Sequence, residues 1–171
     1  MSNSIPKTIE AIEFIERAHH GQLRKHSGLP YIVHCFSVYS TVKEYKDSKN
    51  YDDLGAICLL HDVLEDTGAT KEELEKLFGP MVADAVVELT NDPEEMRRMG
   101  KRAYVDEKLL KLSNYALVVK LADMLSNITD NPTFGTLERI HHHIDFLKSK
   151  RELTGTQKKI VAHIENYFDK I

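Results

Sequence analysis

The residues best able to do chemistry lie in a short segment, 57–67, with the sequence ICLLHDVLEDT. Four polar side chains interrupt this apolar segment: His61, Asp62, Glu65 and Asp66. In a continuous helix their i, i+3 and i, i+4 spacings place them on one broad face. Three carboxylates crowded on one face repel one another and lose hydration unless a cation or a bound ligand compensates. The alternative is an ordinary helix end with solvated acidic residues.

Two further polar positions interrupt apolar segments. Lys120, Asp123 and Asn127 share one face of a strongly apolar helix, and a buried aspartate is costly unless it is paired or bound to a metal. A buried Lys120–Asp123 ion pair with Asn127 as a core amide is the alternative. His34 opens another apolar helix and, taken alone, is more typical of a hydrogen-bonded core histidine.

Together these segments offer two imidazoles and two carboxylates from three expected helices: His34, His61, Asp62 and Asp123. Such a mixture of nitrogen and oxygen ligands suits Mn²⁺, Fe²⁺ or Zn²⁺ and argues against a thiolate site. Four protein ligands leave positions for water and a substrate oxygen. Glu65 and Asp66, one turn away, are placed to orient or deprotonate that water.

The elements that must position these residues are helices. Apolar residues recur at helical spacing almost throughout, no segment alternates strictly, and no hairpin dipeptide appears. The sequence therefore predicts an all-α fold with one compact domain over residues 1–171. One helix is expected between Pro6 and Gly21, and the others at about 31–45, 52–65, 70–79, 81–90, 93–111, 115–129, 136–150 and 156–167.

Three ordered motifs give the sequence a family resemblance. They are RKHSGLPYIVH at 24–34, HDVLEDT at 61–67 and VKLADMLSN at 119–127. Their order resembles that of HD-domain phosphohydrolases, and their flanking residues are similar to the hydrolase domain of RelA/SpoT-type alarmone enzymes. The short chain resembles the single-domain small alarmone hydrolases in particular. The similarity runs from about residue 11 to the C-terminal helix.

The resemblance implies Mn²⁺-dependent removal of the 3′-pyrophosphate from ppGpp or pppGpp, which yields GDP or GTP and pyrophosphate. It implies that His34, His61, Asp62 and Asp123 are the metal ligands. It also implies that Glu65 and Asp66 handle the attacking water.

The same resemblance implies a set of substrate-binding residues. Arg24 and Lys25 match a basic dipeptide near the guanine and phosphates, and Asn127 matches a residue near the ribose. Arg139 takes the approximate place of a phosphate-binding arginine. Relatives carry a basic residue within the stretch 97–102, for which we favour Arg97.

Two departures from the family pattern bear on substrate preference. Met124 stands where an arginine or lysine is usual after the metal aspartate, and Cys35 stands where a proline is usual after the first histidine. Neither is an expected metal ligand. Because the base contacts come from loops that the motifs do not fix, an adenine alarmone or NADPH stays open as the substrate. A nucleoside monophosphate is disfavoured by the 24–31 motif, and a catalytically silent binding module is disfavoured because ligands and the Glu-Asp pair are all present. Synthesis of alarmones is not expected.

Composition sets the remaining bounds. The 171 residues carry a net charge of −4, which disfavours a protein that wraps nucleic acid. The small nucleotide expected as the partner is what the family resemblance implies. No apolar stretch reaches the ~20 residues of a membrane span, and no secretory pattern opens the chain.

Two separate cysteines predict reduced, structural thiols and a cytoplasmic location. The run 141–143 is all histidine, but consecutive helical side chains diverge by about 100°, so we do not expect these three to share an ion. We expect a solvated or substrate-side helix surface there instead. The sequence leaves the oligomeric state open.

Overall fold

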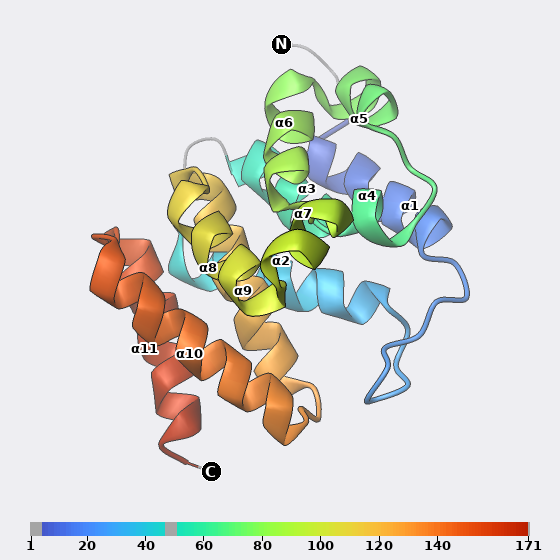
Figure 1. Ribbon diagram of the computed structural model, residues 1–171. Helices are drawn as coiled ribbons and strands as arrows, with labels where there is room; N and C mark the ends of the chain where they lie inside the picture. The colour runs from blue at the N-terminus through green and yellow to red at the C-terminus, as the bar shows by residue number, and fades with distance from the viewer. Residues whose placement is uncertain (1–4, 47–50, 171) are drawn as a thin grey trace.

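The computed structural model describes residues 5–46 and 51–170, and the elements within them are all helical (Figure 1). In these residues the only β-type pairing is an isolated bridge between Leu23 and Pro30. The predicted all-α class is confirmed. The helices are α1 (Lys7–Ala18), α2 (Ile32–Tyr45), α3 (Tyr51–Leu60), α4 (Val63–Asp66), α5 (Lys71–Phe78), α6 (Pro80–Leu89), α7 (Pro93–Met99), α8 (Lys101–Lys111), α9 (Asn114–Thr129), α10 (Phe134–Lys150) and α11 (Gly155–Phe168).

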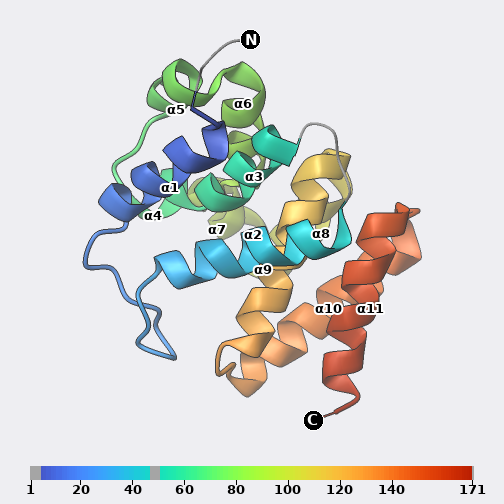
Figure 2. The same cartoon turned by 180° about the vertical axis from the view of Figure 1, so that it is seen from behind.

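Helix α9 runs through the centre of the fold. It packs against α2, α3, α6, α10 and α11, and both views show it crossed by neighbours on several sides (Figures 1 and 2). Its residues from Ala116 to Ser126 are buried except Lys120, so the helix is apolar nearly all round, as expected of an interior helix. Any polar side chain on α9 therefore faces either a partner or a cavity.

Side-chain caps explain several helix boundaries. The hydroxyls of Thr70, Ser113, Thr133 and Thr154 each accept a hydrogen bond from a backbone N–H in the first turn of the following helix. These caps satisfy amides that have no intrahelical partner. They fix where α5, α9, α10 and α11 begin.

The helix predicted at 52–65 is wrong in one respect, because the chain breaks at the chemically important pair. α3 ends at Leu60, and His61 and Asp62 form a turn before the short α4. Asp62 lies at φ −106° and ψ −3°, in the sparsely populated region between α and β. Neighbouring side chains on a regular helix diverge by about 100°, so the break is what allows both residues to face one point.

The helix predicted at 93–111 is also divided. Gly100 adopts φ +82°, a conformation that L-residues with a side chain rarely adopt, and it separates α7 from α8. Apart from the glycine itself, nothing in the charged sequence of this segment predicts the break. The turn redirects α8, and its first residue, Lys101, lines a cavity of about 360 Å³.

Two other expectations concern thiols and membranes. Cys35 and Cys58 are buried free thiols, and burial raises the pKa of both above the ordinary value. Among the described residues, no helix combines the length and the apolar character that a bilayer span requires.

Candidate metal centre and substrate cavity

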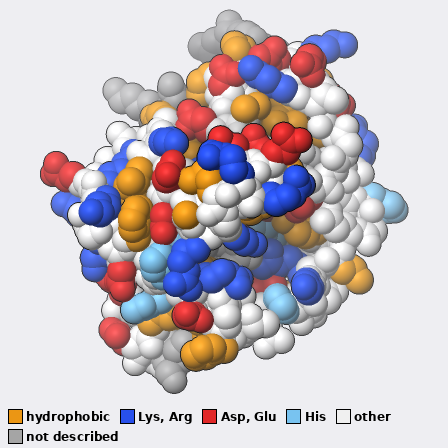
Figure 3. All heavy atoms as spheres, in the orientation of Figure 1, with side chains coloured by type: hydrophobic (Ala, Val, Ile, Leu, Met, Phe, Trp, Pro, Cys, Tyr) orange, Lys and Arg blue, Asp and Glu red, His pale blue; other side chains and the backbone are white. Residues whose placement is uncertain are grey.

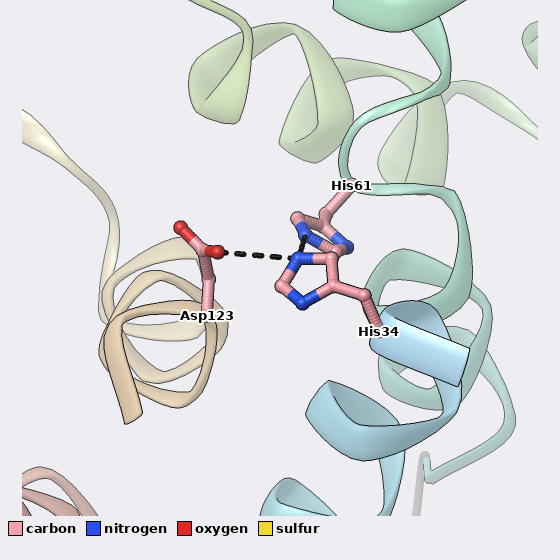
Figure 4. A group of neighbouring side chains, drawn as sticks. All are labelled: His34, His61 and Asp123. Atoms are coloured by element: carbon pink, nitrogen blue, oxygen red, sulfur yellow. Dashed lines mark hydrogen bonds and ion pairs between the residues drawn. The ribbon is translucent and has the colours of Figure 1, made fainter. Parts of the chain in front are cut away.

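Three side chains from separate parts of the sequence converge on one point (Figure 4). His34 comes from α2, His61 from the turn after α3, and Asp123 from α9. His34 Nε2 lies 3.2 Å from His61 Nε2 and 3.3 Å from Asp123 Oδ1. All three residues are buried, with 3–5% of their surface exposed.

The orientation of the two imidazoles indicates a cation between them. His61 Nδ1 is 2.7 Å from the carbonyl oxygen of Cys58, which can only accept, so Nδ1 carries the proton and Nε2 presents a lone pair. His34 Nδ1 contacts Ser126 Oγ at 2.9 Å, which leaves its Nε2 for the same point. Two ring nitrogens that face each other repel unless a proton or a metal ion lies between them. Locking Nδ1 in this way is the usual support of a metal-binding histidine.

Asp62 completes the donor set. Its Oδ2 lies 2.9 Å from His61 Nε2 and 3.4 Å from His34 Nε2. The same oxygen accepts a 2.7 Å hydrogen bond from the hydroxyl of Tyr31. The structure thus brings together all four residues that the sequence suggested as ligands.

Asp123 is held from both sides. Lys120 Nζ lies 2.7 Å from Oδ2, and the amide of Asn127 donates to Oδ1 at 2.6 Å. Burial favours a protonated Asp123, but the Lys120 ammonium and His34 outweigh it and hold its pKa below the ordinary value. The ion pair that the sequence offered as an alternative is therefore present, and it orients Asp123 toward His34 rather than excluding it from the site.

The electrostatics of the cluster favour a divalent cation. Burial lowers the pKa of His34, yet hydrogen bonds to Asp123 and Asp62 raise it to about 9, so the site attracts positive charge. Two neutral imidazoles and two carboxylates match the ligand preferences of borderline transition metals. The residues present therefore fit a metal ion of this class.

Glu65 and Asp66 follow on α4, at the edge of the cluster. Both carboxylate oxygens of Glu65 contact the Asn91 amide, at 2.9 and 3.1 Å, and Lys108 Nζ contacts the amide oxygen of Asn91 at 3.1 Å. Desolvation raises the pKa of Asp66, and the negative charges of Asp62 and Glu65 add to the effect. A carboxylate with a raised pKa is a stronger base than an ordinary aspartate, which favours proton transfer to it.

A cavity of about 360 Å³ opens beside Asp123. Its lining is rich in cations, and Figure 3 shows Lys and Arg side chains gathered around a hollow near the centre of the face seen in Figure 1. Arg24 is fixed there by Asp130 (2.7 Å) and by the amide oxygen of Asn127 (3.0 Å). The polar and charged residues of the lining are Arg24, Lys25, His26, Tyr31, Asn91, Lys101, Lys120, Asp123, Asn127, Asp130, Thr136, Arg139 and His143.

Most of the expected substrate-binding residues line this cavity. Arg24, Lys25, Asn127 and Arg139 do so, whereas Arg97 does not. Arg97 is exposed on α7, and Lys101, beyond the Gly100 turn, is the basic residue of that stretch that reaches the cavity.

Comparison with known proteins places the chain in a family. The sequence model of the HD domain family matches residues 11–132. This chain belongs to the HD domain family. As a member it is an HD-type phosphohydrolase, an enzyme whose fold carries a metal-dependent active site.

Named relatives give a more specific comparison for this HD-domain protein. It is 33% identical over 168 residues to the Drosophila melanogaster protein named guanosine-3′,5′-bis(diphosphate) 3′-pyrophosphohydrolase MESH1, covering 95% of this chain and 93% of the relative. It is 31% identical to human MESH1 over 174 residues, covering 98% and 96% of the two chains. The Escherichia coli K12 protein named bifunctional (p)ppGpp synthase/hydrolase SpoT is 36% identical over 132 residues, which cover 70% of this chain and 17% of SpoT.

The fold comparison agrees. A solved structure described as a metazoan ortholog of SpoT that hydrolyzes ppGpp and plays a role in starvation responses matches with a TM-score of 0.77. The two chains are 28% identical, and the match covers 100% of each.

Several residues that build the site of this HD-domain protein escaped the sequence analysis as site residues. Tyr31 and Ser126 lie within the quoted motifs, but only the tertiary structure shows that they contact Asp62 and His34. Lys101 lies in the stretch where a basic residue was expected, and the signal for it was the preceding glycine. His143 belongs to the run expected to be a solvated or substrate-side helix surface, and it lines the cavity.

Proposed function

We propose that this protein hydrolyses the 3′-pyrophosphate of guanosine alarmones, converting ppGpp or pppGpp to GDP or GTP and pyrophosphate, with Mn²⁺ as its cofactor. The observation that carries the proposal is the group of His34, His61 and Asp123, with Asp62 against both histidines, beside a cation-lined cavity. The chain is also similar over nearly its whole length to MESH1 proteins. The substrate is taken from what those relatives are named for. It fits the cavity because several basic side chains can neutralise a nucleotide that carries two diphosphates.

The donor set has a defined task in this proposal. His34, His61, Asp62 and Asp123 hold the metal ion, and Ser126, Cys58 and Tyr31 keep their donor atoms in place. A bound divalent cation lowers the pKa of a coordinated water and offsets negative charge on the phosphoryl group. Lys120 keeps Asp123 ionised, as a ligand must be.

Glu65 and Asp66 handle the proton. The water oxygen forms a bond to the phosphorus attached to the ribose 3′ oxygen, and the bond from that phosphorus to the 3′ oxygen breaks. One of the two carboxylates accepts the proton of the water, and the leaving 3′ oxygen takes up a proton. Asn91 fixes the orientation of Glu65, and the raised pKa of Asp66 suits it to give or receive a proton.

The cavity binds the nucleotide. Arg24, Lys25, Lys101 and Arg139 contact its phosphates, and Asn127 lies beside the ribose, between Arg24 and Asp123. Arg24 is already held in place by Asp130 and Asn127, so little side-chain entropy is lost when it binds a phosphate.

A turnover screen with Mn²⁺ tests the proposal. The purified protein is offered ppGpp, pppGpp, ppApp, NADPH and nucleoside monophosphates, and released pyrophosphate or phosphate is measured. We expect pyrophosphate from ppGpp and pppGpp, and its loss by a factor of about 10³ or more in Asp123→Ala and His61→Ala. His163→Ala, which removes an exposed histidine hydrogen-bonded to Tyr45, is the matched control and keeps full activity.

Two outcomes contradict parts of the proposal. Turnover of another nucleotide without turnover of ppGpp or pppGpp overturns the substrate. Glu65→Ala should keep its metal, measured by elemental analysis, while it loses turnover. Loss of the metal in that variant would make Glu65 a ligand and overturn the division of roles.

A further inference from the structure

A second group of histidines lies away from the metal donors. Asp106 of α8 contacts two neighbours on α10: its Oδ2 is 2.8 Å from His142 Nε2 and its Oδ1 is 2.7 Å from His143 Nδ1. The sequence led us to expect that the three histidines 141–143 do not converge on one ion. Two of them contact one carboxylate, because one ring presents Nε2 and the next presents Nδ1.

This group has the pattern of a hydrogen-bonded cluster, although its three ligand atoms are close enough to hold a metal ion. Each ring nitrogen faces a carboxylate oxygen, so every contact pairs a donor with an acceptor. At the metal centre, by contrast, His34 Nε2 and His61 Nε2 face each other. Asp106 therefore fixes the proton of His143 on Nδ1 and sets the orientation of the ring, as an orienting carboxylate does in other active sites.

The other nitrogen of His143 is open to solvent, on a residue that lines the cavity. His143 has only 4% of its surface exposed. Nε2 has no hydrogen-bond partner within the described residues, yet it is not among their fully buried unpartnered atoms, of which His19 Nε2 is the one example. Solvent therefore reaches Nε2, and the cavity is a hollow that this residue lines.

The charges around His143 favour an anion next to it. From α8 it faces Lys101, Arg102 and Asp106, from α10 it faces Arg139 and His142, and across the cavity α9 presents Lys120 and Asp123. Burial, His142 and Arg102 lower the pKa of His143 although Asp106 opposes them, so the free protein holds a neutral ring at pH 7. A bound phosphate adds negative charge and favours the protonated ring.

We propose that His143 is a substrate-binding residue whose Nε2 takes up a proton and donates it in a hydrogen bond to a phosphate oxygen of the nucleotide, and that Asp106 is its positioning residue. The inference rests on the proposed function for the identity of the nucleotide. It adds a titratable phosphate contact to the fixed cations of the cavity. Substrate binding then consumes one proton, and its affinity falls as the pH rises through the pKa of His143 in the complex.

Kinetics of two substitutions at His143 form the first test. His143→Asn keeps an N–H for Asp106 but removes the atom at the Nε2 position, whereas His143→Gln keeps a polar atom there without a titratable charge. We expect the KM for ppGpp to rise about tenfold or more in His143→Asn, and less in His143→Gln, with kcat within a factor of about three in both. In both variants, kcat/KM should no longer show the decrease with rising pH that deprotonation of His143 causes in the wild type.

Two further variants complete the kinetic test. His141→Asn is the matched control, because His141 is exposed on the same helix, pairs with Asp145 and does not line the cavity; its KM should not change. Asp106→Asn should raise the KM, because an amide has one acceptor oxygen for the two rings and no negative charge to stabilise a protonated His143. An unchanged KM and pH profile in His143→Asn would overturn the inference while leaving the proposed function in place.

A binding measurement on the wild-type protein keeps the inference testable whatever the turnover result or the folding of the variants. The imidazole signals of His143 are followed by NMR against pH, with and without inorganic pyrophosphate, in Mg²⁺ instead of paramagnetic Mn²⁺. We expect saturating pyrophosphate to raise the pKa of His143 by about one unit, which corresponds to a tenfold coupling. An unchanged pKa would overturn the inference. A second equivalent of Zn²⁺ bound by wild type but not by Asp106→Asn would also overturn it, in favour of a metal site.

Discussion

The proposed metal donors of this protein are held by groups that are not themselves among the proposed ligands. Tyr31 is the most informative of them, because its hydroxyl donates to Asp62 Oδ2 at 2.7 Å and its ring stacks on His19, with centroids 4.7 Å apart. His19 Nδ1 in turn contacts Gln22 at 2.7 Å. Asp62 sits in a turn rather than a helix, so it depends on this bonded tyrosine for its orientation.

Removing that hydroxyl should weaken metal binding. In Tyr31→Phe, Asp62 loses its hydrogen bond while both histidines keep theirs, and we expect Mn²⁺ affinity, measured by calorimetric titration, to fall about 10- to 100-fold. Tyr45→Phe is the control, since Tyr45 lies at the far end of α2 and its hydroxyl contacts the exposed His163 rather than Asp62. Equal affinities in the two variants would show that Asp62 needs no such support.

At this scale the donor types and their order in the chain could be predicted, but their supports could not. His61 and Asp123 stand out because charged or polar residues are unusual in apolar segments. Ser126 and the carbonyl of Cys58 are unremarkable in sequence, and their role follows only from the side chains that the fold brings to them.

Among the helices, α1 depends on a neighbour for its first turn. Its own N-cap residue is Pro6, which offers no side-chain acceptor. Asp52 of α3 supplies one, because its carboxylate accepts from the backbone N–H groups of Lys7 and Thr8 at 2.9 Å each, and from the Thr8 hydroxyl at 2.8 Å. One carboxylate thus caps α1 and joins it to α3, whose last residues lead into the metal centre.

Asp52→Ala should lower the free energy of unfolding by about 1 kcal/mol at pH 7, as the loss of a cap does elsewhere. These hydrogen bonds outweigh desolvation and lower the pKa of Asp52 below 3.8, so its contribution is complete above pH 3.8 and is lost as the pH falls through the lower, folded-state value. Urea unfolding of both proteins at several pH values measures this, and the difference between them should shrink in acid. Asp84→Ala, at an exposed ion pair with Lys71, is the control, and its effect should be small at every pH.

The helices could be predicted where the apolar periodicity and the helix-breaking residues agree. The prediction was less accurate where the site requires a break that the periodicity does not show. The apolar spacing around 57–67 continues through His61 and Asp62, so it predicts one helix. The break that the structure has instead lets adjacent residues face one ion, and no local propensity encodes it.

In the whole molecule, the segment that matches the HD family contains the expected metal ligands, and a helix after it adds residues to the cavity. The family match covers residues 11–132, which include every expected metal ligand. Arg139 and His143 reach the cavity from α10, beyond that match. This is why the metal centre could be predicted with more detail than the substrate contacts. The cations are concentrated at the cavity. A net charge of −4 for the whole chain is therefore compatible with the proposed anionic substrate.

Arg151 is one of the residues that join the two parts. Arg151, just after α10, donates from Nη1 to the carbonyl oxygens of Leu109 (3.0 Å), Leu110 (3.2 Å) and Leu112 (2.7 Å), and from Nη2 to Asn114 (3.1 Å). It therefore satisfies the free carbonyls at the end of α8, where a cation is also favoured by the helix dipole. The position of α10 against α8, and with it the contact between Asp106 and His143, depends on this junction.

Arg151→Met keeps much of the apolar stem and removes the hydrogen bonds. We expect it to lower the free energy of unfolding by about 2 kcal/mol and to raise the KM for ppGpp about threefold or more, because Arg139 and His143 lose their fixed place. Metal affinity should stay unchanged, since its donors come from α2, the turn after α3, and α9. Urea unfolding, kinetics and metal titration measure the three quantities, with Arg98→Met, at an exposed ion pair with Glu95, as the control. A parallel fall in metal affinity would show that the two parts of the molecule are not separable in this way, and an unchanged KM at reduced stability would show that α10 keeps its place without Arg151.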